Sequence, residues 1–364
     1  MSTSPSGKGG DEPRERASVT GGIRAGASTL ARRMGLKKDK EKAHPSDAAA
    51  GAGSNDPAEA AGARGNQPGF PSRPFKKGDV YPLIPGKLSF TVHDSDAMTR
   101  RAIEKEPNLF FFSSDFHERY EPFCADFGPV NLGVVHSFCI FIDGYMSHKQ
   151  LKDRTLIYYT EEADDMRTNG AFLICAYMVI KLGYTPAQAW EPFAAITGEV
   201  GSNTAPFLAY RDATYCEQDY FLSIEACCEG IAKALSLGWY MPDDFGLEDY
   251  EYFDHPSNAD LHRVCPKFVA FKGPSEVRTQ LMPGVYTFTP NYYSEIFKEL
   301  GVGSVVRLNE ASTYKAEGFT KEGIRHHELE FDDCTVPDRQ VVDRFLNIVE
   351  SEEGSVAVHC KAGL

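Results

Sequence analysis

No run of about 18 apolar residues occurs in this 364-residue chain, so the sequence predicts no membrane-spanning helix. The first residues carry early acidic side chains and no continuous apolar stretch, which argues against a secretory signal. The nine cysteines show no CxxC spacing, so neither a metal site nor a disulfide framework is expected, and their odd number fits a reducing compartment. These absences leave a chain of about two domains plus a tail, for which no metal or cofactor is expected.

Charge is unevenly distributed along the chain. The net charge is −14, but residues 1–77 hold 14 basic and 8 acidic side chains, which leaves −20 on the rest. Such an acidic body repels nucleic-acid phosphates and favours basic peptides as partners. Residues 1–77 are rich in Gly, Ala, Ser and Pro without apolar periodicity, which predicts a disordered tail. The basic cluster at residues 32–38 fits a nuclear signal, but an ordinary basic stretch of a tail is the more common explanation.

From Asp79 onward, compact apolar segments alternate with turn residues and indicate two similar modules. The first module is assigned to residues 78–211. In it, residues 156–160 are typical of a buried strand, and residues 167–170 open an apolar helix that runs to residue 182.

The second module is assigned to residues 265–364, with strands at 304–308 and 355–359 and a helix at 338–350. Strands that alternate with helices predict an α/β fold of two tandem domains, each a mostly parallel sheet flanked by helices. Sheets of this kind place their sites at the carboxyl ends of strands.

The segment between the modules, residues 212–264, is interpreted as a linker. It contains a predicted helix at about residues 217–237, followed by an acidic stretch at residues 243–254. A stretch this acidic is usually a solvated surface, but between two domains it could also line a groove.

The second module ends at a strand followed by a cysteine. His359 closes the strand, and Cys360 begins a loop whose backbone N–H groups could hold an anion and stabilise a thiolate, the species that attacks phosphorus. The alternative is a small buried cysteine at the end of a core strand. His359 is either a packed residue or a group that tunes the thiolate from behind the loop. The amides expected to form part of the phosphate site are those of Lys361, Ala362, Gly363 and Leu364.

A second loop, residues 331–337, offers an acid. Phosphoryl transfer to cysteine needs a proton for the leaving oxygen, and Asp333 is the candidate donor. Alternatively, Asp332, Asp333 or Thr335 could cap the helix that begins near Pro337.

Several motifs together are similar to one known family. Residues 356–364 resemble the start of its catalytic signature, and residues 331–337 resemble its general-acid loop, with Cys334 where the family usually has Gly. Five further segments match the family in order: residues 120–132, 168–173, 210–213, 267–271 and 306–309. Over about residues 82–364 the chain resembles the cell division cycle fourteen family of dual-specificity, mitotic-exit protein phosphatases.

The resemblance implies a duplicated phosphatase fold in which only the second copy is catalytic. The chain would dephosphorylate phosphoserine- or phosphothreonine-proline sites, and phosphotyrosine, through a phosphocysteine on Cys360, with Asp333 as acid and then base. It also implies phosphoprotein substrates with a basic residue after the proline, which Glu251 and Asp254 would meet in a groove. A place in cell-cycle control and in the nucleus, nucleolus, cytoplasm or spindle apparatus follows from the family alone.

In the first module, the matching strand end at residues 159–165 has no cysteine and carries four carboxylates that would repel phosphate. In the second module, the family's loop continues with Gly, an arginine that clamps the phosphoryl oxygens, Thr and Gly, whereas this sequence stops at Leu364. We therefore interpret it as a fragment with an incomplete, inactive catalytic domain. The alternatives are a catalytically dead phosphopeptide-binding or regulatory module and a general tyrosine-directed phosphatase, which the linker acids and the two-module match weaken.

Overall fold

The computed structural model describes residues 70–114, 119–198, 205–218, 220–282, 285–332, 335–361 and 363. The predicted disordered tail lies outside these residues up to position 69. Its last part, residues 70–77, is ordered instead: β1 (Arg73–Pro74) pairs in parallel with β6 (Ile196–Thr197). Phe75 is buried and stacks on Tyr81, and the Arg73 guanidinium lies over the same tyrosine ring. These aromatic and cation–π contacts stabilise residues 73–75, so the ordered part of the chain begins before residue 78, the boundary predicted from composition.

A four-stranded sheet forms the centre of the N-terminal module. Its order is β2 (Tyr81–Ile84), β3 (Leu88–Val92), β5 (Thr155–Thr160) and β4 (Leu109–Phe112). β2 is antiparallel to β3, whereas β5 is parallel to both β3 and β4. All five residues of β3 are buried, as expected for a strand covered on both faces.

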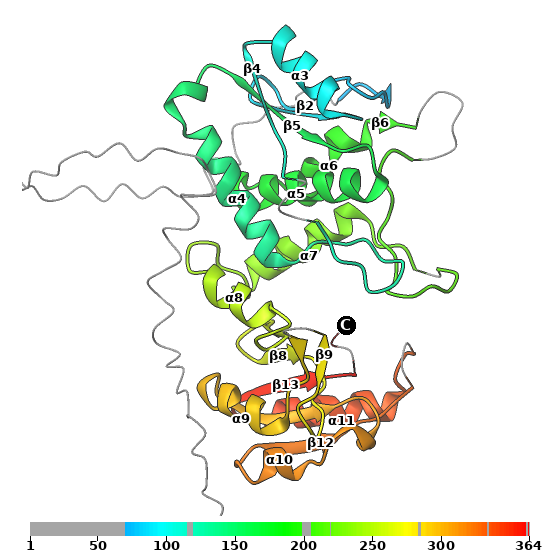
Figure 1. Ribbon diagram of the computed structural model, residues 1–364, viewed down its shortest axis with the longest axis vertical. Helices are drawn as coiled ribbons and strands as arrows, with labels where there is room; N and C mark the ends of the chain where they lie inside the picture. The colour runs from blue at the N-terminus through cyan, green and yellow to red at the C-terminus, as the bar shows by residue number, and fades with distance from the viewer. Residues whose placement is uncertain are drawn as a thin grey trace, which may run out of the picture. The chain divides into compact units, whose positions relative to one another are not determined.

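Helix α5 (Asp164–Leu182) is the central helix of this module. Fourteen of its 19 residues are buried, which explains why its sequence is apolar on all sides. It begins before the predicted opening at residue 167, with Asp164 and Asp165 in a first turn whose positive dipole end favours acids. Figure 1 shows α3 (Asp96–Lys105) above the sheet, with α5 and α6 (Pro186–Ala194) below it.

Helix α7 (Ile224–Ser236) corrects the sequence-based assignment of the linker. It begins at the Ser223 cap rather than near residue 217, and it packs against α5 and α6. Ile224 and Cys228 belong to the core of the N-terminal module. The apolar face of this helix therefore completes the first module and does not bridge the two.

The stretch at residues 120–132, singled out only by the family resemblance, has a structural explanation. Buried Asp126 accepts hydrogen bonds from the Tyr120 hydroxyl at 2.6 Å and from the Cys124 backbone N–H at 2.7 Å. Asn131 then caps α4 (Leu132–Met146) by accepting from the Val134 N–H. The motif thus organises a loop and the helix that follows it.

A five-stranded sheet forms the centre of the C-terminal module. Its order is β12 (Arg325–Glu328), β11 (Val302–Arg307), β13 (Ser355–His359), β8 (Phe268–Phe271) and β7 (Leu261–Arg263). Only the β7–β8 pair is antiparallel. The predicted α/β architecture of two mostly parallel sheets with flanking helices is confirmed.

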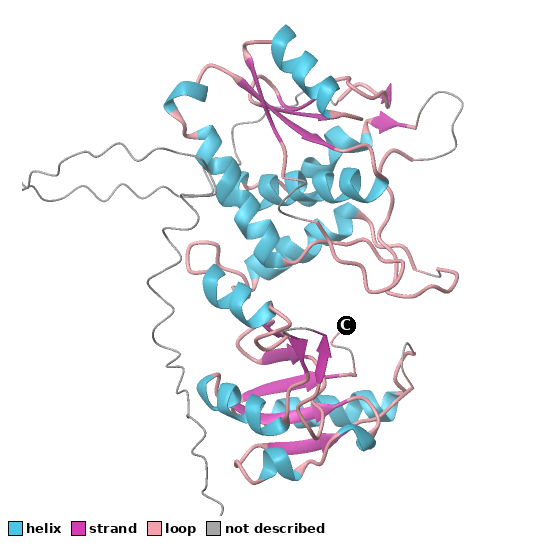
Figure 2. Cartoon of the chain, in the orientation of Figure 1, coloured by secondary structure: helices cyan, strands magenta, loops and turns pink. Residues whose placement is uncertain are grey.

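Helices cover both faces of this second sheet, as Figure 2 shows. α9 (Pro290–Glu299) and α10 (Glu317–Thr320) share one core with Val305, whereas α11 (Arg339–Ser351) packs near Val306 on the other face. Consecutive valines face opposite cores because side chains alternate along a strand. A short hairpin, β9 (Gln280–Met282) and β10 (Val285–Tyr286), precedes α9.

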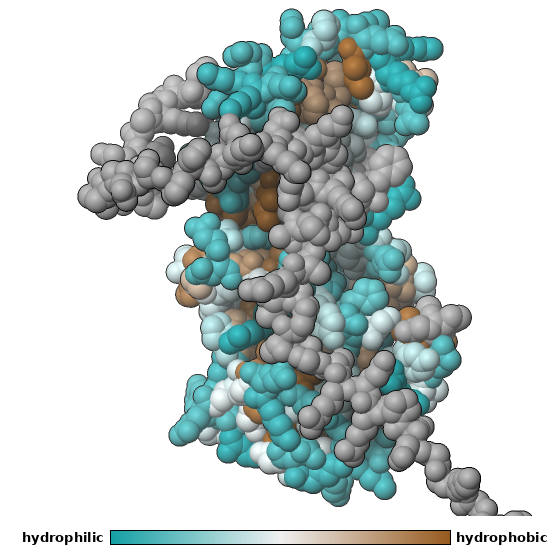
Figure 3. Space-filling model, turned by 60° about the vertical axis from the view of Figure 1, so that its left-hand side comes forward, coloured by the Kyte–Doolittle hydropathy of each residue, from teal (hydrophilic) through white to brown (hydrophobic). Residues whose placement is uncertain are grey.

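Hydrophilic side chains cover most of the described surface on the face drawn in Figure 3, and the hydrophobic areas are small and separate. Within the described residues, no helix is both long and apolar enough to cross a membrane.

Candidate active site

The candidate nucleophile follows the central strand of the second sheet. β13 ends at His359, and Cys360 comes next, with β11 and β8 parallel to β13 on either side. The Cys360 side chain is half-buried, and the Gly363 backbone N–H donates to its Sγ at 3.3 Å. An N–H directed at sulfur stabilises a thiolate relative to a thiol.

Two glycines let the backbone close around this cysteine. Gly363 has φ of +87°, in the left-handed region that favours glycine. A Cβ on Gly273, just after β8, would lie 2.4 Å from the Cys360 carbonyl oxygen, far inside contact distance. The segment after β8 therefore supports the Cys360 loop from one side by direct backbone contact.

The Lys361 side chain turns to an acid at the neighbouring strand end. Its Nζ lies 2.8 Å from Glu310 Oε1, and both side chains are exposed. The hydrogen bond from Lys361 is the main reason that the pKa of Glu310 is lowered. Sequence reasoning missed Glu310, although its place just after the predicted strand 304–308 was a signal that could have found it.

His359 lies beneath the loop and is only 2% exposed. Its Nδ1 is 2.7 Å from the Cys360 carbonyl oxygen, and its Nε2 is 2.7 Å from the Tyr314 hydroxyl. Burial lowers the pKa of His359 to about 4, so the ring is neutral at physiological pH. The tyrosine, and His326 beyond it, were not predicted, because no local pattern links them to the loop.

Three predicted site residues lie outside the described residues: Asp333, Ala362 and Leu364. The helix after the acid loop begins at Arg339 and is capped by Asp338, whose Oδ1 accepts from the Val341 N–H at 2.9 Å. Asp338 lies further along the chain than the expected caps Asp332, Asp333 and Thr335. The helix starts after them, because Thr335 donates to the Asp332 carbonyl in a turn that precedes the helix.

The two predicted groove acids differ in their surroundings. Both lie on α8 (Leu247–Asp254), where Glu251 is exposed and its side chain makes no hydrogen bond or ion pair with another described residue. Asp254 is half-buried, 3.1 Å from His262 Nε2, and accepts from the Asn131 side chain at 3.4 Å. Asp254 thus has local partners, while Glu251 has its carboxylate in solvent.

The matching strand end of the N-terminal module is built differently. After β5, Glu161 pairs with Arg119 and Glu162 with Lys77. Arg167, whose side chain is 8% exposed, is bound by the Asp164 carboxylate and donates to the Glu162 carbonyl. The positive charge at this strand end is therefore already neutralised by the chain itself.

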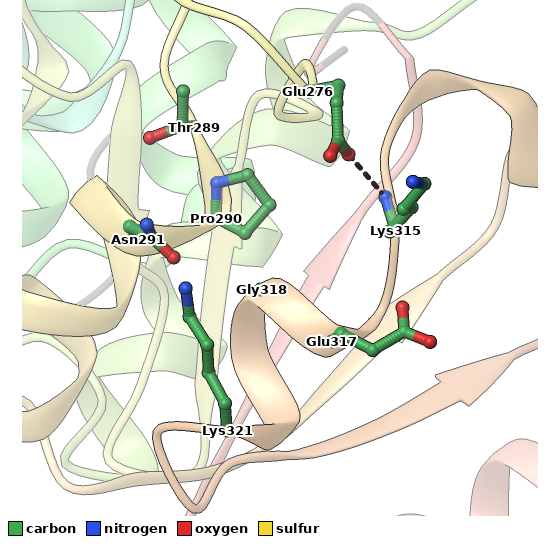
Figure 4. A pocket seen from close by; sticks show the side chains of 8 residues that line it. All are labelled: Glu276, Thr289, Pro290, Asn291, Lys315, Glu317, Gly318 and Lys321. Carbon is green, nitrogen blue, oxygen red and sulfur yellow. Dashed lines mark hydrogen bonds between the residues drawn. The ribbon is translucent and has the colours of Figure 1, made fainter.

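A cavity of about 240 Å³ lies elsewhere in the C-terminal module (Figure 4). It is lined by Glu276, Thr289, Pro290, Asn291, Lys315, Glu317, Gly318 and Lys321. Glu276 accepts from the Lys315 backbone N–H at 2.8 Å across its rim. None of the predicted site residues lines it, and within the described part of the chain no group of three or more His, Cys, Asp or Glu side chains could hold a metal ion.

Comparison with family models gives the class of the two modules. Residues 82–234 match the N-terminal half of dual specificity protein phosphatases. Residues 282–364 match a DSP-PTPase phosphatase family of polymorphic toxin systems. A solved structure of TpbA from P. aeruginosa covers 29% of this chain and 55% of its own, at 21% identity and a TM-score of 0.21, too low to inform the fold. Both modules therefore belong to the class of dual-specificity phosphatase domains.

Curated relatives give the family. The human dual specificity protein phosphatase CDC14C is 34% identical over 81% of this chain, and human CDC14A is 38% identical over 74%. The Schizosaccharomyces pombe tyrosine-protein phosphatase CDC14 homolog is 33% identical over 79%. The chain belongs to the CDC14 family of dual specificity protein phosphatases. It spans 63%, 44% and 52% of the lengths of these three relatives.

Proposed function

We propose that this protein removes phosphate from phosphoproteins through a phosphocysteine intermediate. The observation that carries the proposal is the Gly363 N–H directed at the Cys360 sulfur at the carboxyl end of a central parallel strand. The Cys360 thiolate attacks phosphorus, the bond from phosphorus to the substrate oxygen breaks, and Asp333 gives that oxygen its proton. Water then attacks the phosphocysteine with Asp333 as base, releasing phosphate and regenerating the thiolate.

Backbone amides stabilise the charge that develops during transfer. The N–H groups of the loop after Cys360 bind the phosphoryl oxygens, and His359 holds the Cys360 carbonyl from below. The amides assigned to this role are those of Lys361, Ala362, Gly363 and Leu364.

The proposed substrates are phosphoserine- and phosphothreonine-proline sites followed by a basic residue, together with phosphotyrosine. The acidic helix α8 supports the basic preference, because Glu251 keeps its carboxylate in solvent and can pair with a substrate lysine or arginine. Asp254 would contribute through the local field, since its oxygens already contact His262 and Asn131. A role in cell-cycle control in the nucleus, nucleolus or spindle apparatus fits such substrates.

Peptide turnover tests this function. The substrates are phosphoserine-proline peptides with and without a following lysine, and a phosphotyrosine peptide. Two proteins are assayed: the 364-residue chain, and a chain that also includes any residues its transcript encodes after Leu364. Cys360→Ser should abolish turnover, whereas Cys216→Ser, at an exposed cysteine of another loop, should not. Glu251→Gln should raise KM for the lysine-containing peptide only. Tight phosphopeptide binding without turnover in both proteins would instead favour the phosphopeptide-binding or regulatory role.

A further inference from the structure

A line of short polar contacts connects the Cys360 loop to the edge strand β12. It begins with His359 Nδ1 at 2.7 Å from the Cys360 carbonyl oxygen, and continues from His359 Nε2 to the Tyr314 hydroxyl at 2.7 Å. The same hydroxyl lies 2.7 Å from His326 Nε2. His326 Nδ1 then lies 3.3 Å from Glu328 Oε1.

Neutral groups satisfy three of these contacts but not the fourth. The first three are hydrogen bonds, whereas the approach of His326 to Glu328 is an ion pair only if the histidine is protonated. A neutral imidazole supplies one N–H and a phenol one O–H, so two histidines and a tyrosine supply the three hydrogens that the hydrogen bonds need. The carbonyl and the carboxylate at the two ends can only accept. With both histidines neutral, no hydrogen is therefore left for the contact with Glu328.

The position of the missing hydrogen follows from the fixed end. Because a carbonyl only accepts, His359 Nδ1 must carry its hydrogen, and its Nε2 then accepts from the Tyr314 hydroxyl. The tyrosine oxygen in turn accepts from His326 Nε2, which leaves the Nδ1 lone pair facing Glu328. The gap thus falls at the longest contact of the line. One proton added at His326 Nδ1 satisfies this contact as well. If the Tyr314 hydrogen then moves to His359 Nε2 and the His326 Nε2 hydrogen moves to Tyr314, the positive charge moves to His359 without movement of a heavy atom.

Packing holds the rings in this arrangement. Tyr314 and His359 are each 2% exposed, and the His326 side chain is also 2% exposed. Phe319 stacks on His326 with an interplanar angle of 18°, and Phe271 packs on His359 at 4.8 Å between ring centroids. Neither imidazole can turn over without displacing an aromatic neighbour.

Burial and nearby charges keep His326 neutral at the far end of the line. Burial is the main cause that lowers the pKa of His326 to about 4, and Glu328 opposes it. Arg307 acts in the same direction as burial, and it binds Glu328 through two nitrogens and the Tyr314 carbonyl through a third. Two further charged or titratable groups act on His326: His327, which lowers its pKa, and Glu317, which raises it. Negative charge arriving near Cys360 would act in the same direction as Glu328 and favour uptake of a proton by the line.

We propose that Tyr314 and His326 are positioning residues for the Cys360 loop. Together they hold His359 in the Nδ1–H tautomer and take up one shared proton when Cys360 becomes a thiolate. The inference rests on the proposed role of Cys360 as the nucleophile. His326, three contacts away from Cys360, thereby acts on the loop without touching a substrate.

Alkylation of Cys360 by iodoacetamide, followed by peptide mass spectrometry across pH 5 to 9 in the whole chain, tests the proposal. Tyr314→Phe should slow alkylation at pH 6 about tenfold and raise the pH midpoint by about one unit, because it cuts the line. His326→Gln keeps an N–H toward Tyr314 but cannot take a proton, and should cause a smaller shift in the same direction. The matched control is Tyr292→Phe, whose hydroxyl bonds the Asn258 carbonyl. It should stay within about twofold of the wild type, since Tyr292 does not belong to the line.

The proposal is overturned if Tyr314→Phe and His326→Gln match the wild type, or if Tyr292→Phe has an equal effect. Imidazole 15N–1H spectra of the unsubstituted chain give a check that needs no altered core. They should show His359 as the Nδ1–H tautomer and His326 signals that change at the Cys360 alkylation midpoint, with that change lost in Cys360→Ser. A His359 Nε2–H tautomer, or unchanged His326 signals, would also overturn it. These readouts need no turnover, so they stand apart from failure of the proposed phosphatase function.

Discussion

Replacing Glu352 by glutamine should destabilise the C-terminal module more than its position at a helix end suggests. Glu352 follows α11, and its side chain is 3% exposed. It accepts from the Ser304 hydroxyl on β11, from Arg325 on β12 and from the Gly354 N–H just before β13. One carboxylate thus joins three strands of the sheet that carries the Cys360 loop. Glutamine keeps the shape but directs an N–H₂ group at one of these donors.

The magnitude follows from the ionisation of this carboxyl. The three hydrogen bonds outweigh burial and lower the pKa of Glu352 from 4.5 to about 2. That difference corresponds to about 3 kcal/mol in favour of the ionised form in the folded state. Because the folded pKa is the lower one, this stability is present above the unfolded value of 4.5 and is lost as the pH falls through about 2. Glu352→Gln should therefore lower the free energy of unfolding by about 2–3 kcal/mol at pH 7.

Urea unfolding of the C-terminal transition at pH 7 and at pH 3 measures this effect. The difference between wild type and Glu352→Gln should shrink by about half at pH 3, where much of the contribution has gone. Glu353→Gln is the matched control, because Glu353 is the next residue and is exposed. An equal loss in Glu353→Gln, or a Glu352→Gln difference that does not change with pH, would refute the reasoning.

Three further substitutions probe the loop, its rim and a distant helix. Gly273→Ala places a Cβ 2.4 Å from the Cys360 carbonyl, so Cys360 alkylation and the proposed turnover should each change at least about tenfold while thermal unfolding shows a folded chain. Glu310→Gln releases Lys361 from its 2.8 Å partner, so phosphate should inhibit the proposed activity about threefold more strongly at low salt, and this gain should fade at about 1 M salt. Gly230 is exposed on α7, and a Cβ there meets no atom within 4 Å, so Gly230→Ala should raise the free energy of unfolding by about 0.5–1 kcal/mol without changing Cys360 alkylation. A destabilised Gly230→Ala, or an unaffected Gly273→Ala, would contradict the contacts on which these expectations rest.

The architecture could be predicted because its signals are local. The strand at residues 355–359 is predicted from a short apolar segment followed by turn residues that include Cys360. β13 occupies those five residues. The α7 assignment failed although the signal was present: Ile224, Cys228, Ile231 and Leu235 repeat at helical spacing and all face the N-terminal core. Composition between two modules suggested a linker, whereas this periodicity indicated a packed helix.

The polar line behind Cys360 could not be predicted in the same way. Tyr314 and His326 precede Cys360 by 46 and 34 residues in the sequence. They reach His359 only because β11 lies between β12 and β13, in parallel with both. Sequence separation of this kind carries no periodic signal, and a buried tyrosine or histidine is common in any core. The same limit applies to Glu352, whose three partners come from different strands.

The two modules end their equivalent strands in opposite electrostatic states. After β13, a backbone N–H points at the Cys360 sulfur, and the Lys361 side chain pairs with Glu310 at the rim. After β5, the arginine that could attract an anion is buried and bound by Asp164, and the glutamates of that loop pair with surface cations. An incoming phosphate would have to displace a carboxylate already in place, and would still face its neighbours. The chain's own carboxylates therefore neutralise the cationic side chains at the end of β5, which supports the expectation that only the C-terminal module carries out the chemistry.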